Sequence, residues 1–277
     1  MVTGLLLMAG FVLLLAAVVI GAVMVAEAFG KQIIAEEIVL YSLPEALDGF
    51  RILFISDIHR RTLPAAMLSS LGHVDAVFLG GDLTERNSPL ERLRMNMKLV
   101  TSIAPTYAVH GNHDYRADIG KVDDIIHSSG AVLLRDRNTV IEHGGGQLWL
   151  TGVDFPATGG KKGYAPLPPL PPGSEGSCRI ILVHDPLWLS ERGPQPANLI
   201  LAGHTHGGQV VLPFIGHGHV DNFYRTYNAG WYEWPQVGAA GARAQLLISR
   251  GFGTAHLPLR WGSPAEMHVL TLRCPQD

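Results

Sequence analysis

The longest run of apolar residues lies at the N-terminus of the chain. Residues 4–26 contain no charged side chain. As a helix, such a segment spans about 35 Å, enough to cross the ~30 Å hydrocarbon core of a bilayer. Ala26-Glu27-Ala28 resembles a signal-peptide cleavage site, but no Lys or Arg precedes the run, and the run exceeds the length of a signal h-region. The pattern therefore predicts an uncleaved transmembrane anchor over residues 1–30, with signal-peptide cleavage as the alternative.

Beyond this segment, short apolar runs alternate with helical patterns and then give way to a series of strands. Residues 51–56, 76–82 and 106–114 are apolar runs that end in polar turns, which is typical of buried strands. Residues 64–71, 89–103 and 119–128 have the 3–4 spacing of amphipathic helices. Apolar runs such as 179–186 and 197–206 make the second half rich in strands. The pattern predicts an α/β fold with two packed sheets and helices outside them.

Composition removes two classes of function. The formal net charge is −3, so the chain lacks the basic surface that nucleic-acid binding requires, and we predict no nucleic-acid partner. The two cysteines, Cys178 and Cys274, do not form a C-x-x-C pattern, which argues against a thiolate metal site.

Polar residues with metal-binding chemistry follow directly after five of the apolar runs. They are Asp57, His59, Asp82, Asn112, His113, His184, His204 and His206. Because the carboxyl ends of strands in an α/β fold converge on one edge, these side chains are expected to meet there. Asp57/His59 and His204/His206 have i, i+2 spacing, which places both side chains on one face of an extended chain.

The residue types narrow the cofactor to two divalent metal ions. Imidazole with carboxylate and amide oxygens suits manganese, iron, nickel or zinc, of which we favour manganese. Seven such ligands, with His113 left aside, are too many for one tetrahedral ion and fit two ions that share a carboxylate. Two adjacent metals are a known device for hydrolysing phosphoryl bonds.

Five motifs, "SDIH", "GGDLTE", "GNHD", "LVHDP" and "GHTHGGQ", stand in the order of the calcineurin-like metallophosphoesterase superfamily, which the chain resembles from residue 51 to about 272. The apolar N-terminus and residues 249–266 resemble a branch of membrane-anchored or exported bacterial phosphoesterases, including enzymes that cleave UDP-2,3-diacylglucosamine. The resemblance implies a four-layer α/β/β/α sandwich after one transmembrane helix. We divide the chain into the anchor (1–30), a linker with the first strand (31–50) and the metallophosphoesterase domain (51–277).

The resemblance also implies roles for the matching residues. One metal would take Asp57, His59 and His206. The other would take Asn112, His184 and His204, and Asp82 would bridge the two. His113 would face the phosphate as a catalytic group. Asp114 would either tune His113 or cap the next turn.

The anchor makes a lipid-linked phosphodiester or pyrophosphate, such as UDP-2,3-diacylglucosamine, the expected substrate. The alternatives are a broad-specificity phosphodiesterase or phosphatase acting on soluble substrates and, less well supported, a non-catalytic scaffold. Lys31, Arg51, Arg60 and Arg61 follow the apolar run, which favours a single-pass protein of the bacterial inner membrane with its domain on the cytoplasmic side. No protein partner is predicted.

Several polar residues near the motifs are left without a firm role. Arg60 and Arg61 are expected to be solvated, with phosphate or headgroup binding as the alternative. His110 and His256 are expected to be ordinary core or surface histidines, and "IGHGHVD" (215–221) a rim loop rather than a metal site. Thr205 is unassigned.

Overall fold

The computed structural model describes residues 2–156, 163–174, 176–211, 222–237 and 243–276. Residues 215–221, which are expected to form a rim loop, and residues 157–162 lie outside this part of the chain. The elements are α1 (Val2–Ala28), β1 (Gln32–Val39), η1 (Glu45–Leu47), β2 (Arg51–Ile55), α2 (Ala65–Ser69), β3 (Ala76–Gly80), α3 (Leu90–Thr101), β4 (Thr106–Val109), α4 (Asn112–Arg116), α5 (Ile119–Ser128), β5 (Val132–Leu133), β6 (Arg137–His143), β7 (Gly146–Val153), β8 (Arg179–Val183), α6 (Leu187–Arg192), β9 (Leu199–Ala202), η2 (His206–Gly208), α7 (Asn222–Thr226), β10 (Gly230–Pro235), β11 (Arg243–Ile248) and β12 (Glu266–Arg273).

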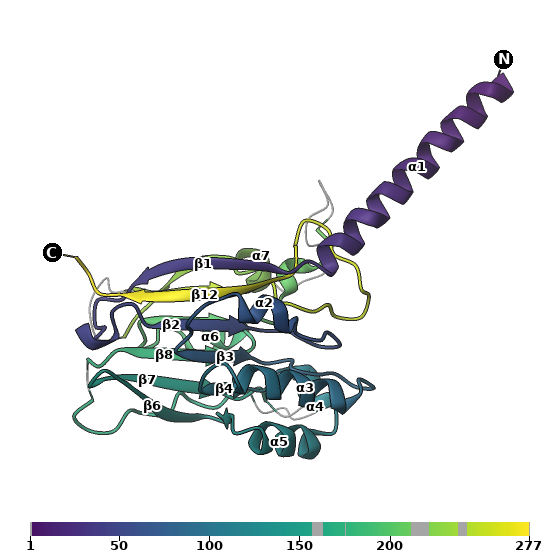
Figure 1. Ribbon diagram of the computed structural model, residues 1–277. Helices are drawn as coiled ribbons and strands as arrows, with labels where there is room; N and C mark the ends of the chain where they lie inside the picture. Colours follow the sequence, from purple (N-terminus) through teal and green to yellow (C-terminus); the bar gives the residue numbers. More distant parts are fainter. Residues whose placement is uncertain (1, 157–162, 175, 212–221, 238–242, 277) are drawn as a thin grey trace.

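The strands form two mixed six-stranded sheets (Figure 1). The first has the order β1-β12-β2-β3-β4-β5, with only β12 and β2 antiparallel. The second has the order β10-β11-β9-β8-β7-β6, and β9 and β8 at its centre are parallel. The predicted α/β class is confirmed as a sandwich of two mixed sheets. The segment 31–50 contributes β1, which pairs with β12 from the other end of the chain.

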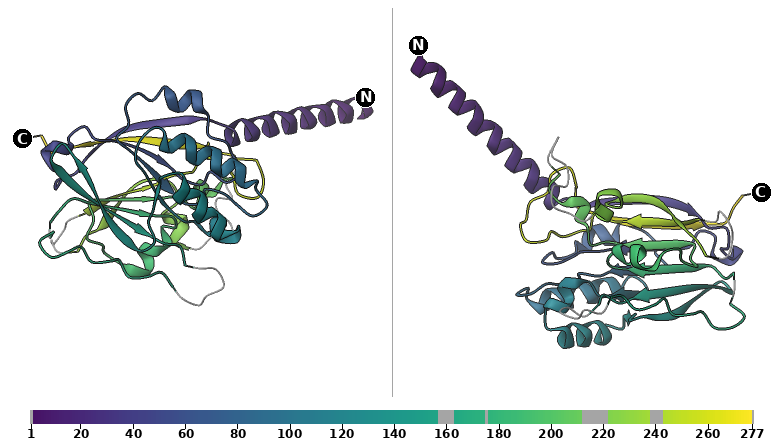
Figure 2. Two further views of the ribbon diagram at one scale, coloured as in Figure 1. Left: turned by 60° about the horizontal axis from the view of Figure 1, so that its bottom comes forward. Right: turned by 180° about the vertical axis from the view of Figure 1, so that it is seen from behind.

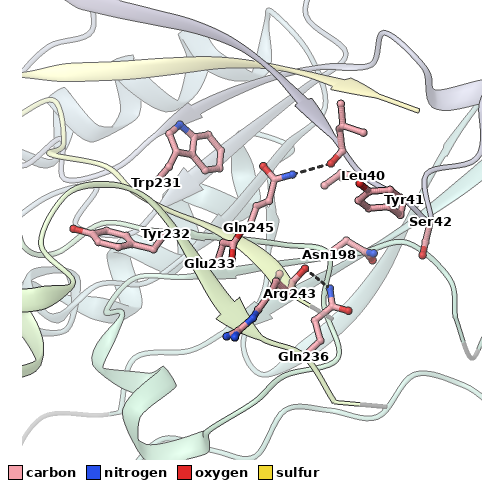
Figure 3. A pocket seen from close by; sticks show the side chains of 12 residues that line it. Leu40, Tyr41, Ser42, Asn198, Trp231, Tyr232, Glu233, Gln236, Arg243 and Gln245 are labelled. Carbon is pink, nitrogen blue, oxygen red and sulfur yellow. Dashed lines mark hydrogen bonds between the residues drawn. The ribbon is translucent and has the colours of Figure 1, made fainter. Parts of the chain in front are cut away.

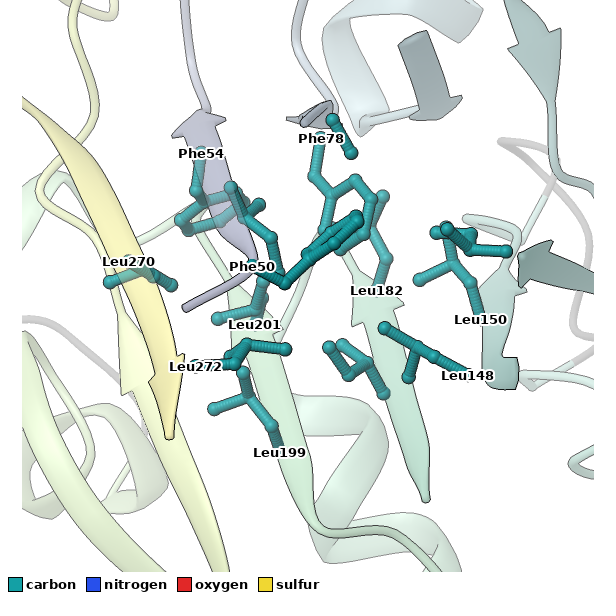
Figure 4. Close-up of a cluster of buried hydrophobic side chains, with 14 of the residues drawn as sticks. Phe50, Phe54, Phe78, Leu148, Leu150, Leu182, Leu199, Leu201, Leu270 and Leu272 are labelled. Atoms are coloured by element: carbon teal, nitrogen blue, oxygen red, sulfur yellow. The ribbon is translucent and has the colours of Figure 1, made fainter. Parts of the chain in front are cut away.

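Three apolar clusters hold together the layers of sheets and helices that Figure 2 shows from two further sides. The cluster between the sheets is drawn in Figure 4. Phe54 and Phe78 of the first sheet pack against Leu182 and Leu201 of the second and form the core between the sheets. The opposite face of the first sheet is covered by apolar residues of α2, α3 and α5. The outer face of the second sheet packs against α6 and α7. Alternate residues of each buried strand therefore serve two different cores, which explains the continuous apolar runs in the sequence.

α1 projects away from the sandwich at the edge toward which β2 and β3 point (Figure 1). It is long and apolar enough to cross a membrane, and its apolar body is exposed. The final turn is different, because Ala28 is buried against the domain. The helix thus has an exposed apolar body and a docked C-terminal end.

The sequence patterns located most elements but missed the short ones. The helix predicted over 119–128 is observed with those bounds, and the one predicted over 89–103 is α3. The strand predicted over 106–114 ends at Val109, because Asn112 begins the short helix α4. Helices α4, α6 and α7 are five or six residues long, too short to show a helical period.

A buried histidine on β12 makes the stability of the fold depend on pH. His268 lies 3.3 Å from Glu266 and 3.7 Å from Glu36 of β1. Burial lowers the pKa of His268, but the hydrogen bond to Glu266 and the nearby Glu36 carboxylate outweigh it and raise the pKa above its ordinary value. The stabilisation of the fold by protonated His268 is therefore fully present below the unfolded-state pKa of this histidine, about 6.5. It is lost as the pH rises through the higher pKa of His268 in the folded state.

We expect His268→Gln to lower the free energy of unfolding by about 1–3 kcal/mol at pH 6 and by less at pH 9. Denaturant unfolding of the wild type and the variant in detergent micelles at both pH values measures the difference. An equal difference at the two pH values would contradict a charged His268.

Candidate metal centre

Five loops from the two sheets meet at one edge of the sandwich. The loops after β2, β3 and β4 come from parallel neighbours in the first sheet, and those after β8 and β9 from parallel neighbours in the second. Backbone hydrogen bonds join them: Asp57 N–H donates to Gly81 O (2.9 Å) and Gly203 N–H to His184 O (2.9 Å). The eight residues expected at this edge are therefore brought together, and their ligand atoms can be compared directly.

Asp57, His59 and His206 form the first group of donor atoms. The Nε2 atoms of His59 and His206 face each other at 3.1 Å, and His206 Nε2 lies 3.5 Å from Asp57 Oδ1. All three side chains are buried, and their donor atoms lie close enough to hold one ion. Two ring nitrogens that point at each other without an intervening acceptor are typical of ligands around a cation.

Asn112, His184 and His204 form the second group. Asn112 Oδ1 lies 3.2 Å from His184 Nε2 and 3.1 Å from His204 Nδ1, and the two ring nitrogens are 3.2 Å apart. Three mutually close polar atoms from three loops define a second point of convergence.

Asp82 lies between the two groups. Its Oδ2 is 3.7 Å from His59 Nε2 and 3.4 Å from His184 Nε2. Ligand atoms about 2.1 Å from one ion lie roughly 3.0–3.4 Å apart in octahedral or tetrahedral geometry. The observed separations are close to this range, so the buried His and Asp residues fit a dinuclear metal site in spacing and in chemistry.

Left-handed backbone positions these ligands. Asp57, His59, Asp82, His204 and His206 all have φ between 51° and 73°. Such values are uncommon for residues with a Cβ and cluster where function requires a particular side-chain direction. The sequence suggested that the two side chains of each i, i+2 pair share one face of an extended chain. The positive φ values show that this is wrong, because these residues are not extended. Tight turns after the strands bring their side chains together instead.

Groups around the ligands fix the imidazole rings. The Nδ1 atom of His184 is 2.9 Å from Gly80 O, which directs Nε2 toward Asp82 and Asn112. A hydrogen bond of this kind sets the tautomer and orientation of a metal-binding histidine. His59 Nδ1 lies 3.2 Å from Glu85 Oε2, an ion-pair contact without hydrogen-bond geometry. Glu85 belongs to "GGDLTE", but the sequence analysis gave it no role.

The charges in the centre are strongly coupled. Burial raises the pKa of Asp82, but the adjacent His184 and His59 outweigh it and lower the pKa of this carboxyl. Burial lowers the pKa of the His184 imidazole, but Asp82 raises it to about 10. A cation that binds at these nitrogens must displace a proton, so metal loading should strengthen with rising pH.

His113 and Asp114 occupy different places. The His113 ring is half-buried and packs edge-on against His59, with ring centroids 4.8 Å apart. The backbone N–H of His113 donates to Asp82 Oδ1 (2.7 Å). Asp114 is fully buried behind the loop, where its oxygens accept the N–H groups of Gly111 (2.9 Å) and Thr84 (3.0 Å). Of the two roles considered for Asp114, these contacts correspond to capping. An influence of Asp114 on the adjacent His113 stays a prediction.

The structure gives Arg60, Arg61 and Thr205 definite partners. Arg60 is exposed and forms an ion pair with Glu85. Arg61 is partly buried over the Phe252 ring (3.7 Å) and donates to main-chain carbonyls, so the expected solvated pair is wrong for this residue. Thr205 Oγ1 accepts Gly207 N–H (3.2 Å) and donates to Asn228 O, which fixes the turn between His204 and His206.

A close approach of backbone to Asp82 requires glycine at position 111. A Cβ there would lie 2.1 Å from Asp82 Oδ1 and 2.5 Å from Asp82 N, so Asp82 would have to move. We expect Gly111→Ala to reduce bound metal and to lower kcat/KM at least about a hundredfold. Metal analysis and phosphodiester hydrolysis measure both effects.

Gly120→Ala is the matched control, because it lies on exposed helix α5 with its nearest neighbour at 3.8 Å and should keep full activity. Normal metal content in Gly111→Ala would show that the loop tolerates the side chain.

A pocket of about 830 Å³ lies elsewhere, between the end of β1 and strands β10 and β11 (Figure 3). Tyr41 just after β1, Trp231 of β10 and Gln245 of β11 are among its lining residues, none of which belongs to the metal-centre loops. The metal centre lies elsewhere, at the edge where the strand ends of the two sheets meet.

Comparison with known proteins agrees with this geometry. Residues 50–208 match the family described as calcineurin-like phosphoesterase. The chain is 32 % identical to the uncharacterized protein YpbG of Bacillus subtilis over 231 residues, covering 81 % of this chain and 82 % of YpbG. It is 30 % identical to the phosphodiesterase YaeI of Escherichia coli, covering 80 % and 82 % of the two chains. A transmembrane protein with a metallophosphoesterase domain from Danio rerio is 26 % identical, covering 87 % of this chain and 57 % of that protein.

The family match spans more than half of the chain and includes the strand-end loops that carry the buried His and Asp clusters. The chain belongs to the calcineurin-like phosphoesterase family and is a metal-dependent phosphoesterase.

Proposed function

We propose that this phosphoesterase is membrane-anchored and hydrolyses a lipid-linked phosphodiester or pyrophosphate, with UDP-2,3-diacylglucosamine as the sharpest candidate. The observation that carries the proposal is the place where α1 joins the domain. The helix ends on the same edge of the sandwich as the metal centre, so a membrane that holds α1 lies near the reacting groups.

The contacts of the last turn of α1 support this placement. Arg61, two residues after His59, donates to the carbonyl oxygens of Ala28 (3.3 Å) and Gly30 (2.9 Å). On the other side, Ser263 donates its N–H to Glu27 (3.3 Å) and its hydroxyl to His206 O. One residue on each side of the helix end thus connects α1 to a proposed ligand loop.

These contacts also favour retention of the helix over cleavage. Arg260 N–H donates to Met24 O (3.0 Å) and Ala265 N–H to Glu27 O (3.0 Å). Removal of residues up to Ala28 would leave the backbone N–H groups of Arg260 and Ala265 without these acceptors, and it would remove one of the carbonyl acceptors of Arg61. A helix end that completes the domain is better explained as an anchor than as a signal segment. The basic residues after the helix favour a cytoplasmic domain, which a UDP-linked lipid would require.

We assign the residues of the centre as follows. Asp57, His59 and His206 hold one divalent ion and Asn112, His184 and His204 the other, with Asp82 shared. When bound, two such ions activate water and offset the charge of the phosphoryl group. Asn112 is a neutral ligand, so the loaded centre retains net positive charge for an anionic substrate. His113 stands beside the first group, where it can donate a proton to the leaving oxygen.

A second candidate is a broad phosphodiesterase that acts on soluble substrates. It is favoured by the similarity to YaeI, which is named a phosphodiesterase. In that case the anchor would hold the enzyme at the membrane without contributing to the choice of substrate.

A comparison of substrates separates the two candidates. The manganese-loaded full chain in detergent micelles would be assayed with UDP-2,3-diacylglucosamine, with UDP-glucose and with an aryl phosphodiester. The lipid-linked proposal predicts a kcat/KM for the lipid at least about a hundredfold above that for UDP-glucose. Equal values for the two nucleotides would favour the broad phosphodiesterase, and hydrolysis of none of the three would refute both.

A further inference from the structure

A loop outside the five motifs presents one more imidazole to the metal-centre edge. His256 is exposed, and its ring lies 5.9 Å from the ring of His113, centroid to centroid, at an interplanar angle of 63°. Because His113 packs against His59, His256 is the next histidine outward from the proposed metals. We propose that His256 contacts the substrate, donating a hydrogen bond to a phosphate oxygen on the solvent side of His113.

The backbone of His256 is held in an unusual conformation. His256 has φ 58°, and Leu257 N–H donates to Ala255 O (2.7 Å), which closes a three-residue turn with His256 at its apex. Turns of this kind with positive φ are rare and strained for residues other than glycine. A merely exposed histidine does not require such a turn, whereas a histidine that must project in one direction does.

One side chain maintains the turn. The Nε2 atom of Gln209 donates to Ala255 O (2.9 Å) and Leu257 O (3.0 Å), and its Oε1 accepts Ala255 N–H (2.8 Å). Gln209 is the last residue of "GHTHGGQ" and has φ 51°. Gln209 therefore connects two segments: the turn with His256 at its apex and the loop that carries His204 and His206. It is a positioning residue for His256.

The positive-φ residues of the described chain support the same reading. There are nine such residues other than glycine, and five of them are proposed metal ligands. Gln209 and His256 are two of the remaining four. Left-handed backbone is thus concentrated at the metal centre and at the His256 turn, as expected if both belong to one site.

The chemistry indicates what His256 recognises. An imidazole on an exposed turn, beside a centre that attracts anions, suits hydrogen bonding to a phosphate oxygen. A hydrogen bond to a charged group contributes about a tenfold to hundredfold preference. This inference rests on the proposed roles of the metal centre and extends the binding site beyond His113.

The test uses the manganese-loaded full chain in detergent micelles. Two readouts are taken for each variant: kcat/KM for bis(p-nitrophenyl) phosphate and the dissociation constant of inorganic phosphate by calorimetry. We expect His256→Ala to weaken phosphate binding and lower kcat/KM about tenfold to a hundredfold with unchanged metal content. His256→Gln, which retains an N–H donor, should recover part of the loss.

Gln209→Ala should reproduce the loss, and the double variant should be no worse than either single variant, because both changes remove the same contact. His127→Ala, an exposed histidine on α5, is the matched control and should behave as the wild type. Phosphate affinity and kcat/KM within twofold of wild type in His256→Ala would overturn the inference, as would loss of metal in that variant. If the wild type did not turn over bis(p-nitrophenyl) phosphate, the affinity for inorganic phosphate would still test His256, while the proposed function is tested separately by the comparison of three substrates.

Discussion

Replacement of Asp82 by asparagine is expected to abolish the dinuclear centre. Asp82 lies between the two groups of proposed ligands, and it is almost completely buried, at 1 % exposure. The substitution keeps the shape of the side chain but removes the negative charge that two cations would share. We expect binding of at least one ion to be lost and kcat to fall about a thousandfold.

Metal analysis after equilibration with manganese, together with hydrolysis of an aryl phosphodiester, measures both effects. Asp118→Asn is the matched control, because Asp118 caps α5 at the surface and asparagine caps helices equally well. Thermal unfolding of both variants shows whether the fold persists. Two bound ions and near-normal activity in Asp82→Asn would show that the centre does not depend on a shared carboxylate.

The position of the site was predictable because it depends on chain topology. Parallel strands place their carboxyl ends at one edge, so Asp57, Asp82 and His184 could be brought together from the apolar runs that precede them. The identity of each buried strand followed from its apolar pattern in the same way. Both inferences use only the order of strands and the residue types at their ends.

The contacts around the ligands could not be predicted, because they depend on turns and on distant partners. Asp57 and His59 share a ligand group through left-handed turns, not through extended chain. Arg61 joins the loop of His59 to the end of α1, a contact between segments about thirty residues apart that leaves no periodic signal. Glu85 and Gln209 belong to two of the five motifs, so the sequence could single them out. Only the structure shows their contacts, which are with His59 and Arg60 for Glu85 and with the His256 turn for Gln209.

Replacement of His113 by alanine is expected to separate metal binding from catalysis. The His113 ring contacts His59 edge-on, and its ligand atom lies within 4.8 Å of those of His59 and Glu85, a third cluster that could hold an ion. His113 belongs to neither of the two proposed ligand groups, so its removal is expected to leave those ligands in place. Its N–H bond to Asp82 is a backbone contact, which alanine preserves. Burial lowers the pKa of His113, which makes its proton easier to release to a leaving oxygen.

We therefore expect His113→Ala to retain two metals and to lose about a hundredfold to ten-thousandfold in kcat. The loss should be greater for an alkyl phosphodiester than for a p-nitrophenyl one, because a poor leaving group depends more on protonation. Metal analysis and the two assays measure this, with His127→Ala as the control. Equal losses on both substrates would indicate that His113 stabilises phosphate charge rather than donating a proton, and loss of metal would show that it belongs to the centre itself.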